Sequence, residues 1–312
     1  MQSFSDIIQA SETKCVLVTG CDMYSGFMIV REFLKEKDKH FKHICAGYYK
    51  ENHLIHMLKK EGADTCELTV DKPEHIVDMY RKVDIVIVVP PVNEHRWGDS
   101  SVAYVLAAKE ANVKGLVLCS KINVKELSEM KMLAPLCKME EAYERVKSSM
   151  KAASLVRCSM HIDMLWLFRH QIAEKHKICL PIGKEAECAP LAQADGAHAL
   201  CNMLLHSKYK PGVYELTGPE KLNFKDIAHE ASSAIGVEIN YEQIDSKQME
   251  EYLKHHHEIC ENEIMFMCDL FKAISKNMLT KKTDDLKKML DSSPHTVKSF
   301  LKKNARDFKP HN

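Results

Sequence analysis

The sequence contains no stretch of apolar residues approaching the roughly 18 that a membrane-spanning helix needs, so we expect no contact with a membrane. It also has no excess of charge of either sign, because 44 lysines and arginines balance 44 aspartates and glutamates. A domain whose surface grips nucleic acid would be strongly basic. Direct binding of nucleic acid is therefore not expected.

Paired cysteine motifs are missing as well. The twelve cysteines are scattered and include no C-x-x-C pair, which is the spacing typical of zinc and dithiol sites. We interpret them as free thiols of a reducing compartment and predict no metal site. Residues 1–13 lack the basic segment and apolar stretch of a secretory signal. These features predict a cytoplasmic protein, with the nucleus as a second location.

Short apolar runs alternate with helical patterns through the first half of the chain. The most hydrophobic run is 84–89 (DIVIVV), which stops at a pair of prolines. The other expected strands are 15–18, 43–47, 65–70, 115–120 and 154–157, and the helices between them include 27–35, 52–61, 101–111 and 136–152. Strands that alternate with helices at this rhythm predict an α/β fold with a Rossmann-type, doubly wound parallel sheet.

The second half is mostly helical. Helices are expected at 194–205, 224–235, 246–257, 261–276 and 296–303, and short strands at 178–181 and 212–216. We therefore predict a Rossmann-like domain over 14–160 and a smaller, mostly helical domain over 161–312. The segment 190–216 is expected to return to the first domain.

The most specific stretch is 14–27, KCVLVTGCDMYSGF. The strand at 15–18 runs into Gly20, and Gly26 opens the next helix, which is the context of a dinucleotide-binding loop. A helix N-terminus in that position aims N–H groups and a positive dipole end at phosphate. In a G-x-x-G-x-x-G loop, the middle glycine allows the backbone to approach the pyrophosphate closely. Here Met23 takes the place of that glycine. The loop is therefore a degenerate one.

The order of the motifs resembles the NmrA-like family, whose members are atypical short-chain dehydrogenases/reductases. The resemblance extends from about Lys14 to Phe308 and includes VTGCDMYSG (18–26), DIVIVVPP (84–91), LVRCSMHIDML (155–165) and ADGAHALCNMLL (194–205). It implies a Rossmann domain with a small helical C-terminal domain and NAD or NADP in the cleft. Members of the family include nucleotide-sensing transcriptional co-regulators and NADPH-dependent quinone-type reductases.

The resemblance also implies the residues that would contact the cofactor. They are Gly20, Cys21, Asp22, Met23, Tyr24, Ser25, Gly26, Tyr48, Lys50, Thr69, Val89, Pro90 and Lys138. Two departures from the family pattern accompany Met23. Tyr48 stands where NADP-preferring relatives have an arginine, and Thr69 stands where members place an acidic residue near the adenine.

Short-chain dehydrogenases move a proton with a tyrosine four residues before a lysine. Lys138 occupies the family's lysine position, but the residue four positions earlier is Ala134. The pattern Y-x-x-x-K does occur at Tyr143–Lys147, later in the helix than the family register. The catalytic candidates are therefore Lys138, as a ribose contact or a solvated lysine, and Ser120, as a nicotinamide-side hydroxyl or a strand-end cap.

A substrate pocket is the remaining candidate site. His161, Met164 and Trp166 could form its wall, although aromatic and methionine side chains at such spacings also suit a core. Three hypotheses for function follow. The first is a non-catalytic NAD(P)-binding, redox-sensing regulator that acts on a protein partner. The second is an NADPH-dependent reductase of quinones or related small carbonyl compounds, and the third is a small-ligand or protein-binding module that has lost its nucleotide.

Overall fold

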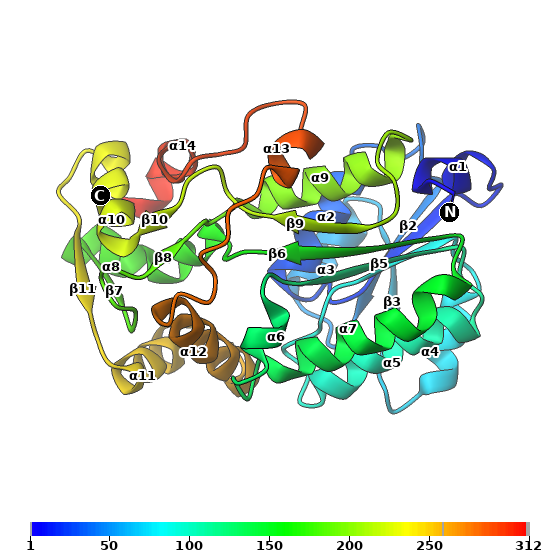
Figure 1. Ribbon diagram of the computed structural model, residues 1–312, viewed down its shortest axis with the longest axis horizontal. Helices are drawn as coiled ribbons and strands as arrows, with labels where there is room; N and C mark the ends of the chain where they lie inside the picture. The colour runs from blue at the N-terminus through cyan, green and yellow to red at the C-terminus, as the bar shows by residue number, and fades with distance from the viewer. Residues whose placement is uncertain (1, 258, 310–312) are drawn as a thin grey trace. The chain divides into compact units, whose positions relative to one another are not determined.

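The computed structural model describes residues 2–257 and 259–309 (Figure 1). The described chain forms two compact units. Unit 1 comprises residues 2–121, 134–157 and 196–214, and unit 2 comprises the remainder. The sequence predicts a main boundary near 160 and a return of 190–216 to the first domain, and the structure divides the chain into alternating segments of the two units. Residues 122–133, expected in the first domain, belong to unit 2, and 196–214 is the part of 190–216 that belongs to unit 1.

A seven-stranded sheet is built in the order β3-β2-β1-β4-β5-β6-β9. The strands are β1 (Cys15–Val18), β2 (His43–Tyr48), β3 (Asp64–Glu67), β4 (Ile85–Val88), β5 (Gly115–Lys121), β6 (Ala152–Cys158) and β9 (Val213–Leu216). The pairs from β3 through β5 are parallel. Every residue of β1 and β4 is buried, as expected for apolar central strands. The doubly wound Rossmann-type sheet is thus confirmed, and its order reverses beside β1, where such sheets bind ligands.

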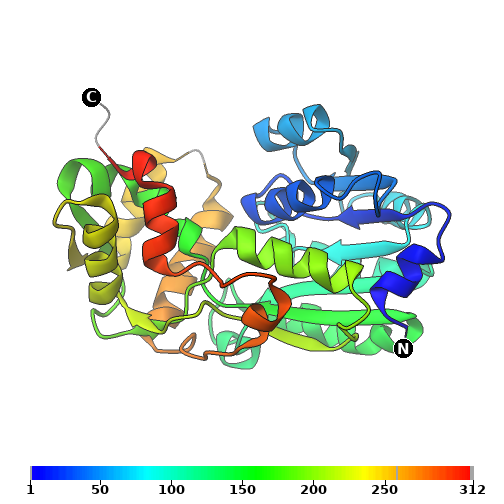
Figure 2. The same cartoon turned by 90° about the horizontal axis from the view of Figure 1, so that it is seen from above.

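Helices cover both faces of this sheet. They are α1 (Phe4–Gln9), α2 (Tyr24–Leu34), α3 (His53–Lys60), α4 (Pro73–Tyr80), α5 (Trp97–Glu110), α7 (Ala134–Val146) and α9 (Gln193–Leu205). The helices α2 and α9 share one face, where His198 Nδ1 lies 2.8 Å from Glu32 Oε1 (Figure 2). The other face carries α4, α5 and α7 (Figure 1). The helix expected over 136–152 ends at Val146, because the apolar residues from Ala152 onward enter the buried β6.

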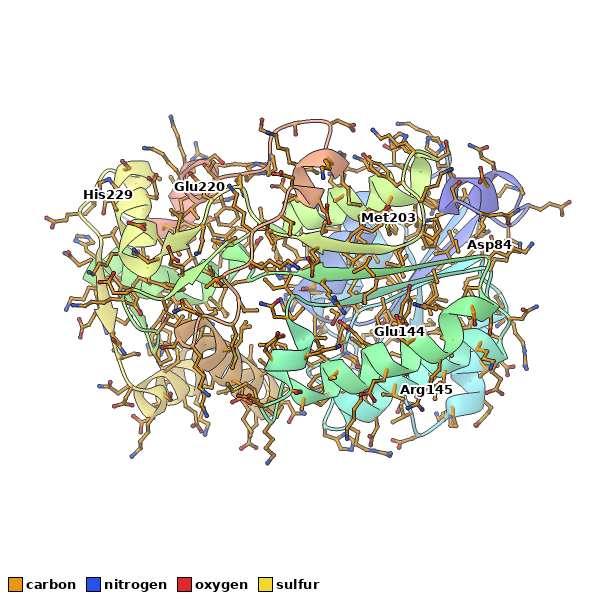
Figure 3. The ribbon with its side chains drawn as sticks, in the orientation of Figure 1. Asp84, Glu144, Arg145, Met203, Glu220 and His229 are labelled. Atoms are coloured by element: carbon orange, nitrogen blue, oxygen red, sulfur yellow. The ribbon has the colours of Figure 1, made fainter. Side chains whose placement is uncertain are left out.

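A buried carboxylate ties the amino ends of the strands together. Asp84, directly before β4, accepts hydrogen bonds from Ser11 Oγ and Thr13 Oγ1 at 2.7 Å each and from Cys15 N at 3.0 Å. Lys114 Nζ lies 2.6 Å from its other oxygen. Figure 3 shows Asp84 close to α1 at this end of unit 1. Because a buried charge needs such partners, the network stabilises the end of the sheet opposite the candidate site.

Unit 2 is mostly helical, as predicted. It contains α6 (Val124–Leu127), η2 (Ile162–Phe168), α8 (Arg169–Lys175), α10 (Phe224–Ile235), α11 (Ser246–His256), α12 (Glu261–Ser275), α13 (Asp285–Met289), α14 (Val297–Lys303) and two small sheets, β7 (Lys177–Leu180) with β11 (Asn240–Gln243) and β8 (Glu187–Cys188) with β10 (Leu222–Asn223). The helix α10 matches its predicted bounds because Asn223 caps its start and Gly236, at φ +84°, ends it. Among the described residues, no helix has the length and apolar character to span a membrane.

Candidate functional site

The turn after β1 is shaped by its two glycines. Gly20 has a φ of +64°, and a Cβ at this position would lie 2.9 Å from Val89 O. A Cβ on Gly26 would lie 2.4 Å from Gly20 O. Real Cβ atoms essentially never approach a backbone oxygen so closely, so the first turn of α2 packs directly on the glycine turn. This close approach is what the first and third glycines of a dinucleotide-binding loop provide.

Side-chain and backbone hydrogen bonds fix the turn against the neighbouring strands. Thr19 Oγ1 donates to Val89 O at 2.8 Å and accepts from Val89 N at 2.9 Å. On the other side, Cys21 N donates to Gly47 O at 2.9 Å. The Cys21 thiol points inward, and burial raises its pKa well above the usual value. Val89 and Cys21 therefore hold the turn in place through their backbone atoms.

Met23 does not distort the loop. It precedes α2 with φ −114° and ψ 154°, an extended conformation that any residue adopts, and its N–H donates to Gly20 O at 3.2 Å. Its side chain is half-buried, and the next residue, Tyr24, is 37% exposed. Replacing the middle glycine with methionine therefore adds a side chain beside the N-terminus of α2 and leaves the path of the loop backbone intact.

Asp22 is the hydrogen-bonding centre of the site. Its side chain is buried, and Oδ2 accepts from Lys50 N at 3.0 Å and from Asn93 Nδ2 at 2.7 Å. Its backbone oxygen accepts from Asn52 Nδ2 at 2.7 Å. These bonds join the loops that follow β1, β2 and β4 at the carboxyl edge of the sheet. The sequence predicts Asp22 and Lys50 as cofactor contacts, and the structure brings them together.

Asn52 and Asn93 are missed by sequence reasoning. Asn52 carries a recognisable signal, because its Oδ1 caps α3 by accepting from Leu54 N and Ile55 N. Its second role, the amide bond to the glycine turn, depends on the fold. Asn93 follows the proline pair in an irregular loop, and no sequence pattern marks it.

Tyr48, the last residue of β2, and Thr69, in the loop after β3, form hydrogen bonds with nearby residues of the chain. Tyr48 O accepts from Leu68 N at 2.8 Å, and burial is the main cause that raises the pKa of the Tyr48 phenol. Thr69 Oγ1 accepts from Asp71 N at 3.3 Å in the turn that leads into α4. The side chain of Lys50 is exposed, and Pro90 is half-buried. Tyr48 ends β2, and the other three residues lie in loops at the carboxyl edge.

Ser120 and Lys138 occupy different environments. Ser120, near the end of β5, is 6% exposed, and its Oγ has no hydrogen-bond partner within residues 2–257 and 259–309. Lys138 is an exposed residue of α7.

The alternative tyrosine–lysine pattern is Tyr143–Lys147. The phenol of Tyr143 is buried, and this burial raises its pKa, whereas Lys147 forms an ion pair with Glu144 at 2.6 Å. The Tyr143–Lys147 pattern therefore does not form a proton-transfer pair.

The predicted pocket residues His161, Met164 and Trp166 lie at or within η2 of unit 2. All three are half-buried, and the Trp166 ring packs against that of Phe300 with centroids 5.3 Å apart. Trp166 therefore contributes to the packing of unit 2, as expected if its side chain belongs to the core. A role for these residues in a substrate pocket stays a prediction.

Three comparisons place the chain among known proteins. The model of the NmrA-like family matches residues 12–302. NAD(P)H azoreductase of Xenophilus azovorans is 24% identical over 293 residues, which span 94% of this chain and 99% of the relative. The structure of Citrobacter sp. triphenylmethane reductase complexed with NADP(H) superposes with a TM-score of 0.76 at 18% identity, covering 93% of this chain and 99% of that one. The negative transcriptional regulator NmrA in complex with NADP gives 0.70 at 12% identity, covering 92% and 94%.

The sheet order and the glycine turn define a Rossmann-type α/β protein. The chain belongs to the NmrA-like family, because the family model matches nearly all of it. The resemblance drawn from its motifs is thereby confirmed. The relatives include both a regulator and reductases, so family membership alone does not choose between the two.

Proposed function

We propose that this protein is an NAD(P)-binding, redox-sensing regulator that lacks the proton-transfer residues of the short-chain dehydrogenases. The observation that carries the proposal is the geometry of the glycine turn. Gly20 and Gly26 keep the close backbone approach of a dinucleotide loop, and Met23 leaves the path of the backbone intact. A regulator of this kind transmits the state of its nucleotide to a protein partner.

The residues at the carboxyl edge fit a dinucleotide. The N-terminal turn of α2, with its N–H groups and positive dipole end, would hold the pyrophosphate of the cofactor. Ser120 Oγ, buried and without a partner among the described residues, supplies a hydroxyl for the nicotinamide half. Lys138 is the candidate ribose contact. When bound, the cofactor supplies or accepts a hydride.

Neither tyrosine position of the short-chain dehydrogenase pattern offers a general acid in this protein. Ala134 stands in the position of the family's tyrosine, and burial raises the pKa of the Tyr143 phenol, which is opposite to the change a proton donor needs. A positioned acid typically contributes about 10²–10⁴-fold in rate. Reduction or oxidation of an alcohol–carbonyl pair is therefore not expected.

The second candidate is a reductase of quinones, azo compounds or dyes. The likeness to the azoreductase over 94% of the chain favours it, and hydride transfer to such acceptors relies mainly on the cofactor. It requires an open path to the nicotinamide and no tyrosine acid.

The rate of NAD(P)H oxidation in the presence of quinone, azo and triphenylmethane acceptors separates the two candidates. For a regulator, we expect no acceptor to raise this rate above that of the protein-free control, whereas NAD⁺ and NADH bind with different affinities. Differential affinity is required of a sensor, because a ligand shifts an equilibrium only by the difference in its binding to two states. Acceptor-dependent turnover would establish the reductase and overturn the regulator.

A further inference from the structure

Four acidic residues lie in the loops at the carboxyl edge of unit 1, and three of them are accounted for locally. Glu51 forms an ion pair with Lys59 of α3 and lies 3.7 Å from His56, while Asp71 lies 3.6 Å from Arg96. Glu94 is buried, desolvation raises its pKa, and a hydrogen bond with Ser100 opposes that rise. The fourth is Asp22.

One carboxylate oxygen of Asp22 has no hydrogen-bond donor among the described residues. The residue is 4% exposed, and Oδ2 accepts two hydrogen bonds. Oδ1 is buried and accepts none from any residue that the structure describes. Leaving a buried acceptor without a donor costs free energy. Such an atom therefore usually binds a water, an ion or a ligand, or has a functional role. A hydroxyl of a bound ligand would be such a donor.

The position of Asp22 identifies the ligand group. In dinucleotide-binding sheets, an acid at the end of the second strand accepts a hydrogen bond from the ribose 2′-hydroxyl of NAD. Here β2 is followed by Tyr49 and Lys50, and the next acid, Glu51, is engaged by α3. The bond from Lys50 N to Asp22 Oδ2 places the Asp22 carboxylate at that same strand end.

We propose that Asp22 determines nucleotide specificity, accepting the adenosine 2′-hydroxyl of NAD(H) and excluding the 2′-phosphate of NADP(H). The inference rests on the proposed binding of a dinucleotide and names which one binds. A 2′-phosphate would bring negative charge against a carboxylate in a site shielded from water, where the repulsion between like charges is strong. The exposed Lys50 ammonium offers a single point charge in place of the guanidinium fork that suits phosphate.

Calorimetric titration of NADH and NADPH into the wild type, Asp22→Asn and Asp71→Asn tests this proposal. We expect the wild type to bind NADH about tenfold or more tightly than NADPH, and Asp22→Asn to reduce that ratio about tenfold, because the amide removes the charge and keeps the shape. Asp71→Asn is the matched control, since its carboxylate is exposed in the neighbouring loop, and it should leave the ratio unchanged.

A second measurement needs no variant. An NADH analogue that lacks the adenosine 2′-hydroxyl should bind the wild type about tenfold more weakly than NADH, because it leaves Asp22 Oδ1 without a donor. Equal affinity for NADH and this analogue, or tighter binding of NADPH, would overturn the role of Asp22 while leaving the proposed function intact. The absence of binding by every nucleotide would overturn both proposals.

Discussion

Replacing Gly26 with alanine is expected to abolish nucleotide binding. The added Cβ would lie 2.4 Å from Gly20 O and 2.9 Å from Cys21 Cα, and both neighbours belong to the backbone of the glycine turn. The first turn of α2 must therefore move away from the turn, which separates the N–H groups from the place of the pyrophosphate. Overpacking of this kind also costs about 1–3 kcal/mol of folding free energy. Titration calorimetry and thermal unfolding measure the two effects.

The matched control is Gly212→Ala. A Cβ at Gly212 would lie 3.9 Å from its nearest neighbour, Lys210 O, which is an ordinary contact. This variant should keep wild-type affinity and change stability by less than about 0.5 kcal/mol. If Gly26→Ala bound nucleotide as well as Gly212→Ala does, the glycine turn would not be the phosphate site.

Replacing Asp84 with alanine should destabilise unit 1 by about 3 kcal/mol. The substitution removes an acceptor that serves two hydroxyls and the Cys15 N–H, and it leaves Lys114 without its counter-charge. Urea denaturation measures the loss. The control Asp78→Ala removes an exposed partner of Arg81 and should change stability by less than about 1 kcal/mol.

The pH dependence of stability gives a second test of the Asp84 network. Desolvation acts to raise the pKa of Asp84, but the bonds from Lys114, Ser11, Cys15 and Thr13 outweigh it and lower the pKa below the usual value. A depressed folded-state pKa contributes stability above the unfolded-state pKa of about 3.9 and loses it as the pH falls through the folded-state value. The difference in stability between wild type and Asp84→Ala should therefore shrink below about pH 4. A difference independent of pH would contradict this assignment.

Much of unit 1 follows from local pattern. The strand 15–18 is visible because its apolar run is continuous, and α4 begins at Pro73, a residue type that suits the first turn of a helix. The helix after the glycine turn begins at Tyr24, earlier than the expected Phe27, because the loop itself supplies its first turn. The short strand β11 has mostly exposed residues and takes its conformation from pairing with β7, so no local signal predicts it.

The candidate site is predictable only in part. The glycines at 20 and 26 carry a known spacing, and Asp22 lies between them, so the sequence includes it among the cofactor contacts. Its role at the end of β2 depends on bonds to Lys50 and Asn93, which are 28 and 71 residues away along the chain. Contacts at such separations are set by the packing of parallel strands and leave no periodic trace in the sequence.

Nucleotide binding itself is measured most directly by titrating NADH and NADPH into the wild type and into Met23→Gly. We expect the wild type to bind at least one of them with micromolar affinity, about −8 kcal/mol, because Met23 leaves the backbone of the turn unchanged. Met23→Gly should bind as tightly or more tightly, since it removes a side chain next to the N-terminus of α2. A folded wild type that binds neither nucleotide would contradict the proposed function, and binding regained by Met23→Gly would identify Met23 as the residue that closes the site.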